Sequence, residues 1–273
     1  MDEYEKIQSE FSQMCLLWEG NVPWEEKKHL EYLIQKARKL QQRIPGPAVS
    51  FNHVVEIPYY EFFTGAEEYR FAKMSINRMY CRLSGILKER GDLRSAEHAL
   101  QCALQWNPVD LDAHFALADL YKQEGNLKKS LEVSHRAHCY CNTKAALARY
   151  YRNLGYCFLE SYQPDLAQAL YQYSRIYCDT ESAKRELEFL AAAMKRDTKI
   201  PDPKHLHMLL EENHIPPGFN PFTTALTYKA YKMEEQLGHT AKAGECYVLF
   251  QDQTSVSMDG AVLLINDLLI FSL

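Results

Sequence analysis

Residues 77–110 read NRMYCRLSGILKERGDLRSAEHALQCALQWNPVD, and residues 111–144 read LDAHFALADLYKQEGNLKKSLEVSHRAHCYCNTK. Each stretch is 34 residues long, and the two align on each other. Gly91 and Gly125 lie 34 positions apart, as do Ala103 and Ala137. Self-similarity at a fixed period of about 20 to 50 residues is typical of repeat proteins. These two stretches therefore predict a protein built from short structural repeats.

A third copy fits residues 148–181, after the three-residue insertion Ala145 to Leu147. The pattern of a large residue, Leu-Gly, an aromatic, then Ala and a closing Pro resembles the tetratricopeptide repeat, a helix-turn-helix unit. The first copy is the best match, because Gly91-Asp92 stands at the turn and Pro108 at the end of the second helix. The third copy departs from the family, with Tyr162-Gln163 at the turn and Asp179 in place of the Pro.

The resemblance implies an all-α solenoid of stacked helical hairpins. A single hairpin cannot bury both of its faces, so such repeats gain stability by stacking. Composition agrees, since 33 Leu and 25 Ala against 9 Val and 11 Ile favour helix over sheet. We expect the flanking segments to extend or cap the array.

The flanks give a three-part organisation. Residues 1–58 predict a helical hairpin, about 3–19 and 24–43, followed by an irregular or extended linker as far as Pro58. Residues 59–200 predict the repeat array, with helix from about Tyr60 and again over 181–196. Residues 201–273 predict a proline-rich break with one short helix near 205–212, a divergent hairpin over 224–250 and an apolar tail.

The tail, Ala261 to Leu273, contains ten apolar residues among its 13. It is shorter than the roughly 17 to 25 residues that a membrane-spanning helix needs, and Asn266 and Asp267 interrupt it. We therefore expect no membrane span. Packing on the last hairpin is the preferred role, and contact with a membrane surface or a partner is the alternative.

Charge and the N-terminal sequence restrict the partners and the location. The 31 basic and 36 acidic residues give a net charge of −5, which argues against nucleic acid as a partner. The acidic start at Met1 to Lys6 is not a secretory signal, so we expect a cytoplasmic protein with reduced cysteines.

The densest group of ligand-type side chains is His135, His138, Cys139 and Cys141. On one helix these four residues occupy two different faces, so they do not readily surround a tetrahedral ion. The sequence also lacks the nucleophile-elbow, phosphate-loop, dinucleotide-binding and zinc-protease motifs. We expect no enzyme, no metal and no cofactor, although a zinc site or a Cys-His pair remains the alternative from a different class of function.

In the resembled family the first helix of each repeat lines a concave groove. At the corresponding positions of this chain, we expect a partner-binding groove formed by Arg78, Phe115, Asp119, Lys122, Arg149, Arg152 and Tyr156. Arg149 and Arg152 are three residues apart with Tyr156 one turn further, a grouping suited to an acidic peptide. A solvated charged face paired with acidic neighbours is the competing interpretation.

The family's carboxylate clamp for chaperone tails needs Lys and Asn where this chain has Cys81 and Gly85, then Phe115 and Asp119. A heat-shock chaperone tail is therefore not the expected ligand. The sequence predicts a non-catalytic adaptor or scaffold that binds a peptide or helix of another protein. A peptide-responsive regulator that uses the solenoid as its sensor is the second hypothesis.

Overall fold

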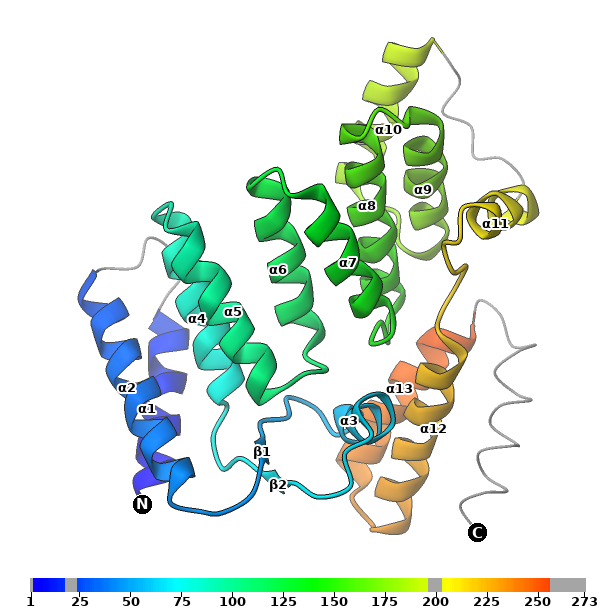
Figure 1. Cartoon of the computed structure of the whole chain (residues 1–273). Helices are drawn as coiled ribbons and strands as arrows, with labels where there is room; N and C mark the ends of the chain where they lie inside the picture. The colour runs from blue at the N-terminus through cyan, green and yellow to red at the C-terminus, as the bar shows by residue number, and fades with distance from the viewer. Residues whose placement is uncertain (1, 18–23, 196–202, 256–273) are drawn as a thin grey trace. The chain divides into compact units, whose positions relative to one another are not determined.

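The computed structural model describes residues 2–17, 24–195 and 203–255 (Figure 1). The predicted tail Ala261 to Leu273 lies outside these residues. The described helices are α1 (Glu3–Leu17), α2 (Trp24–Gln42), α3 (Glu56–Thr64), α4 (Ile76–Glu89), α5 (Leu93–Trp106), α6 (Leu111–Gln123), α7 (Leu127–His138), α8 (Lys144–Glu160), α9 (Pro164–Tyr177), α10 (Glu181–Met194), α11 (Pro203–Glu212), α12 (Pro221–Gln236) and α13 (Thr240–Thr254). The predicted all-α class and the predicted repeat helices are confirmed.

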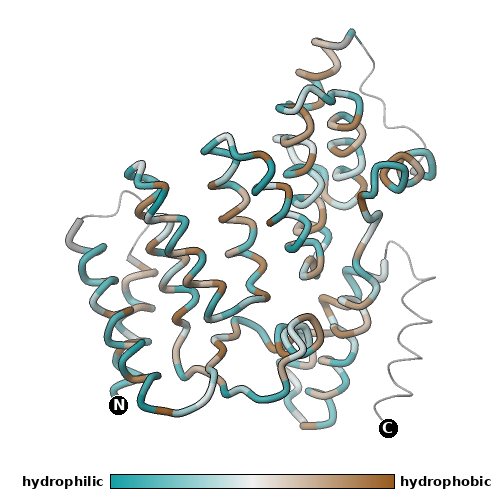
Figure 2. Tube along the Cα trace, viewed as in Figure 1, coloured by the Kyte–Doolittle hydropathy of each residue, from teal (hydrophilic) through white to brown (hydrophobic). Residues whose placement is uncertain are grey.

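Hydrophobic and hydrophilic residues alternate along these helices, as Figure 2 shows. On α5, for example, Ala96, Ala99, Leu100 and Ala103 are buried, which is the spacing of one helix face. Small residues at this face allow close helix approach, and burial of the whole face stabilises the hairpin.

The hairpin turns share one hydrogen-bonded geometry. Gly91, Gly125 and Gly238 all have φ between 72° and 78°, the left-handed region that glycine adopts without strain. The following N–H groups reach back five residues, with Asn126 N donating to Tyr121 O at 2.8 Å and His239 N to Glu234 O at 2.9 Å. This is the Schellman helix ending, and it explains why glycine recurs at the predicted turns.

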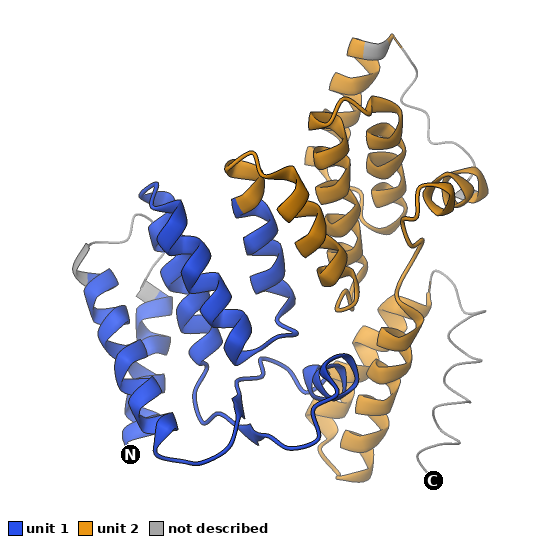
Figure 3. Cartoon of the chain, viewed as in Figure 1, with its two compact units in different colours: residues 1–120 blue, residues 121–273 orange. Residues whose placement is uncertain are grey.

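The chain divides into two compact units, residues 1–120 and 121–273, with the boundary inside α6 (Figure 3). This division is based on contacts. The three-part organisation by sequence character, with limits at 58 and 200, stays a prediction.

In the first unit, α1 packs on α2, and α2 packs on α4. The apolar face predicted for α2 is buried, including Leu30, Leu33 and Ala37. The predicted irregular stretch to Pro58 is wrong in part, because α3 begins at Glu56 and contains Pro58. Proline is tolerated there because the first-turn N–H groups of a helix have no intrahelical acceptor.

The helical pattern predicted from about Tyr60 is interrupted between α3 and α4. Helix α3 ends at Gly65, which has φ 67° and donates its N–H to Glu61 O at 3.0 Å. Two short parallel strands then pair, β1 (Ala48–Val49) with β2 (Arg70–Phe71). Arg70 holds this segment in place, since its guanidinium donates to Gln41 O at 2.7 Å and Ile44 O at 3.1 Å.

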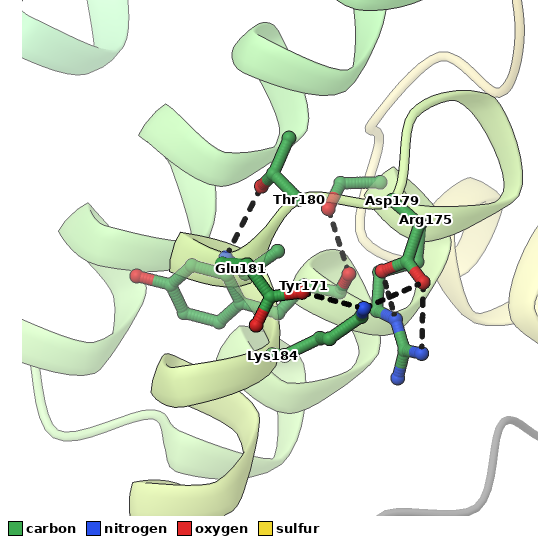
Figure 4. Close-up of polar contacts among 8 residues, drawn as sticks. Tyr171, Arg175, Asp179, Thr180, Glu181 and Lys184 are labelled. Atoms are coloured by element: carbon green, nitrogen blue, oxygen red, sulfur yellow. Dashed lines mark hydrogen bonds and ion pairs between the residues drawn. The ribbon is translucent and has the colours of Figure 1, made fainter.

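In the second unit, α7 packs on α8, α8 pairs with α9, and both α10 and α11 pack on α9. The α9–α10 corner contains Asp179 in place of the family's proline. Its carboxylate accepts from Arg175 Nε at 2.7 Å and lies 3.7 Å from Lys184 Nζ, and Thr180 caps α10 (Figure 4). Ion pairing and capping thus end one helix and start the next without proline.

The predicted proline-rich break contains α11 at the expected place and then a segment bound to α7 and α8. Tyr151 Oη donates to Pro216 O at 2.9 Å and accepts from Gly218 N at 2.8 Å. His138 Nε2 lies 2.9 Å from Gly218 O. A segment rich in proline is therefore fixed by side chains of the repeat helices.

Candidate functional site

Two arginines of the predicted groove lie on one side of α8, a helix that begins at a capping threonine. Thr143 caps the helix, its Oγ1 accepting from Ala146 N at 3.1 Å. Arg149, Arg152 and Tyr156 then follow at spacings of three and four residues, so they lie on one side of the helix. All three side chains are half-buried, and Asn153 next to them is buried.

Lys122 at the end of α6 joins this group within the second unit. Its Nζ donates to Asn153 Oδ1 at 2.8 Å and lies 5.4 Å from the centre of the Tyr156 ring. A cation over an aromatic face is attracted by the ring quadrupole. We call Lys122, Arg149, Arg152, Asn153 and Tyr156 the α8 cationic face.

Two donors of the α8 cationic face are buried without an acceptor among the described residues, Arg152 Nη1 and Asn153 Nδ2. Burial lowers the pKa of the Arg152 guanidinium, and the charge of Arg149 acts in the same direction. A buried donor without an acceptor is destabilising, and a carboxylate is the strongest acceptor for it. Both atoms are closed off from solvent, so an anionic group would reach them only when the side chains of the face move apart.

The structure places the seven predicted groove residues in two units. Lys122, Arg149, Arg152 and Tyr156 belong to the second unit and form the group above. Arg78 is exposed on α4 and Asp119 half-buried on α6, both in the first unit. Phe115 exposes only 1% of its surface, so it belongs to the core and is left out of the binding surface proposed below.

Asn153 was missed by the sequence analysis because family positions directed attention to its neighbours. The available signal was an amide one turn from both Tyr150 and Cys157, a spacing that places it at the buried side of the helix. Its contact with Lys122 joins residues 31 positions apart in the chain, which local sequence does not specify.

The His/Cys cluster does not converge on one point. His135 Nδ1 lies 3.1 Å from Tyr150 Oη, His138 Nε2 contacts Gly218 O, and Cys141 Sγ donates to Ala137 O at 3.4 Å. Burial raises the pKa of both Cys139 and Cys141, which disfavours the thiolate needed by a nucleophile or a metal ligand. Within the described part of the chain, no group of three His, Cys, Asp or Glu side chains is arranged to hold a metal ion.

A buried carboxylate cluster lies in the first unit. Glu56 accepts from Asn52 N at 2.7 Å and Asn107 Nδ2 at 2.8 Å, and Asp110 accepts from Asn77 Nδ2 at 2.7 Å and Asn52 Nδ2 at 3.1 Å. Burial raises the pKa of Glu56 to about 7, and Asp110 adds to the effect while the amide donors oppose it. The amides already occupy both carboxylates, so the cluster joins the 50–56 segment to α4 and α5 and is not arranged as an acid–base pair.

No protein-family profile matches the sequence, and no curated protein matches it. A solved structure titled "Functional Characterization of Pseudomonas Aeruginosa pilF" is similar at 16% identity and a TM-score of 0.27, over 70% of this chain and 97% of that one. Among the described residues, no helix combines the length and the apolar character needed to cross a bilayer.

Proposed function

We propose that this chain is a non-catalytic adaptor or scaffold that binds an acidic segment of a partner protein on the α8 cationic face. The observation that carries the proposal is the pair of buried donors without acceptors, Arg152 Nη1 and Asn153 Nδ2, beside the charges of Lys122 and Arg149. An acidic side chain would supply the missing acceptors, and Tyr156 would pack on its aliphatic part.

The partial burial of Arg152 favours binding of an acidic group in addition to its charge. Exposed ion pairs contribute little because water screens them, about 0 to 1 kcal/mol each. The half-buried guanidinium of Arg152 is less well solvated, so an incoming carboxylate would displace less water. We also propose a cytoplasmic location, inferred from the acidic N-terminal sequence, and no binding of nucleic acid, inferred from the net charge of −5.

The test measures binding of fluorescent peptides that carry randomised Asp and Glu positions, against matched peptides with Asn and Gln. We expect the acidic peptides to bind more tightly, and Arg149→Ala with Arg152→Glu to weaken that binding at least about tenfold, or 1.4 kcal/mol. The matched control is Lys128→Ala with Arg136→Glu, which makes the same change of net charge at exposed positions of α7. Equal losses in both double variants, or no loss in the first, would show that the face is not the binding site.

A further inference from the structure

The α12–α13 hairpin repeats the α8–α9 hairpin with an offset of 76 residues. The left-handed turn residues correspond, Tyr162 with φ 61° and Gly238 with φ 74°. The long-range turn bonds correspond too, since Gln163 N donates to Phe158 O and His239 N to Glu234 O, both at 2.9 Å. Each residue of the earlier hairpin therefore has a counterpart 76 positions later.

The outer face of α9 is covered by α10. Tyr171 exposes 3% of its surface and packs with Leu187 and Leu190 of α10, and Leu159 of α8 borders the same cluster. Gln168, one turn before Tyr171, and Gln172, the residue that follows Tyr171, are buried as well. Helix α10 thus covers the part of the α8–α9 hairpin around Tyr171.

The same face of α13 is exposed. Tyr247, the counterpart of Tyr171, is 42% exposed, and Val248, the counterpart of Gln172, is 63% exposed. Gly244, the counterpart of Gln168, has no described atom within 4 Å of where a Cβ would be. An apolar face is therefore open at the place where α10 lies on the preceding hairpin.

A depression of about 270 Å³ marks this face. Its lining residues are Tyr231, Glu235, Gly238, Thr240, Ala243, Gly244 and Tyr247. Their counterparts in the α8–α9 hairpin, 76 positions earlier, are Gly155, Leu159, Tyr162, Pro164, Ala167, Gln168 and Tyr171. Leu159 and Tyr171 are the residues that border Leu187 and Leu190, so the depression is the counterpart of the place that α10 fills.

We infer that the apolar segment Ala261 to Leu273 of this chain occupies that face of α12 and α13. Leu264, Leu268 and Phe271 have the same four-then-three spacing as Ala183, Leu187 and Leu190, the buried residues of α10. The segment comes after α13 in the chain, as α10 comes after α9, and the six residues 255–260 between them can span up to about 20 Å. A second copy of the chain or a separate partner would lack this covalent proximity, which raises the effective concentration of the segment.

The test uses the full chain and measures amide hydrogen exchange along α13 by mass spectrometry. Leu264→Asp with Leu268→Asp is expected to speed exchange over residues 244–252 at least about tenfold, because the face loses its cover. The matched control, Asn266→Asp, places a carboxylate in the same segment away from the Leu264 stripe and is expected to leave exchange unchanged. Exchange over α4 and α5 reports whether the remainder of the fold is intact.

Two results would overturn the inference. Exchange over residues 244–252 that does not respond to the double variant means that the segment does not cover the face. Protection that rises with protein concentration, together with a larger mass by light scattering, assigns the cover to a second copy. Neither result bears on acidic-peptide binding, which depends on α6 and α8.

Discussion

A Cβ atom on Gly155 would lie 3.1 Å from Cε2 of Tyr171 and 3.2 Å from its Cδ2. Gly155 stands in α8 and Tyr171 in α9, so the absence of a side chain sets how closely the two helices of the hairpin approach. The ring in turn carries the cluster with Leu187 and Leu190. Close approach within the hairpin and packing of the next helix therefore depend on the same pair.

Gly155→Ala is expected to destabilise the protein by about 1 to 3 kcal/mol, because the added methyl overpacks a buried contact. Chemical denaturation measures the change. Gly85→Ala is the matched control, since Gly85 is helical with open space around it and the substitution should stabilise by about 0.5 to 1 kcal/mol. Similar effects of the two substitutions would contradict the proposed contact.

Tyr162→Gly is expected to stabilise the protein by up to about 1 kcal/mol. Tyr162 holds the left-handed turn of the third repeat, where a non-glycine residue costs about 1 to 2 kcal/mol, and glycine's larger unfolded-state entropy offsets part of the gain. The side chain is 94% exposed, so little packing is lost. Thermal unfolding should show a higher midpoint. Gly91→Ala, the reverse change at the first repeat, should lower it.

These turns show what the sequence can and cannot specify. Glycine at positions 91 and 125 predicts a left-handed turn at each, and the distance between these two turns gives the 34-residue period. Tyr162 occupies the same conformation without the residue type that predicts it, so only alignment with the other repeats locates that turn. The start of α3 and strand β2 were mispredicted, because long-range bonds around them, such as Ser50 N to Trp106 O at 2.8 Å and Ala72 N to Val49 O at 2.8 Å, are not specified by local sequence.

The binding surface was predicted in part for the same reason. Helical spacing places Arg149, Arg152 and Tyr156 together, because that relationship is local. The pairing of Lys122 with Asn153 joins residues 31 positions apart, and the burial of Phe115 depends on the tertiary packing around it. Neither relationship is contained in the spacing of residues along one helix.

Stability should depend on pH through Glu56, whose pKa burial raises to about 7. The folded state then holds a proton that the unfolded state releases near its ordinary pKa of 4.5. This contribution to stability is fully present below pH 4.5 and is lost as the pH rises through 7, at a rate of up to about 1.4 kcal/mol per pH unit. Glu56→Gln should remove this slope.

The measurement is the free energy of unfolding at several pH values between 4.5 and 8 for both proteins. Other carboxylates contribute equally to the two curves, so their difference isolates Glu56. The variant should gain stability relative to the natural protein as the pH rises. Parallel curves would mean that Glu56 titrates in the folded protein as it does in the unfolded chain.

Tyr151→Phe should release the segment from Pro216 to Gly218. The hydroxyl is both the donor to Pro216 O and the acceptor for Gly218 N, so its removal leaves two backbone groups without these partners. The expected loss is about 1 to 3 kcal/mol in the free energy of unfolding, with faster hydrogen exchange at the Gly218 amide. Tyr162→Phe removes the same atom from an exposed ring and should change neither quantity. Because α11 and α12 lie on either side of this segment, a loss confined to Gly218 would assign Tyr151 a local role, and faster exchange in α12 would show that the hydroxyl also holds the last hairpin to α8.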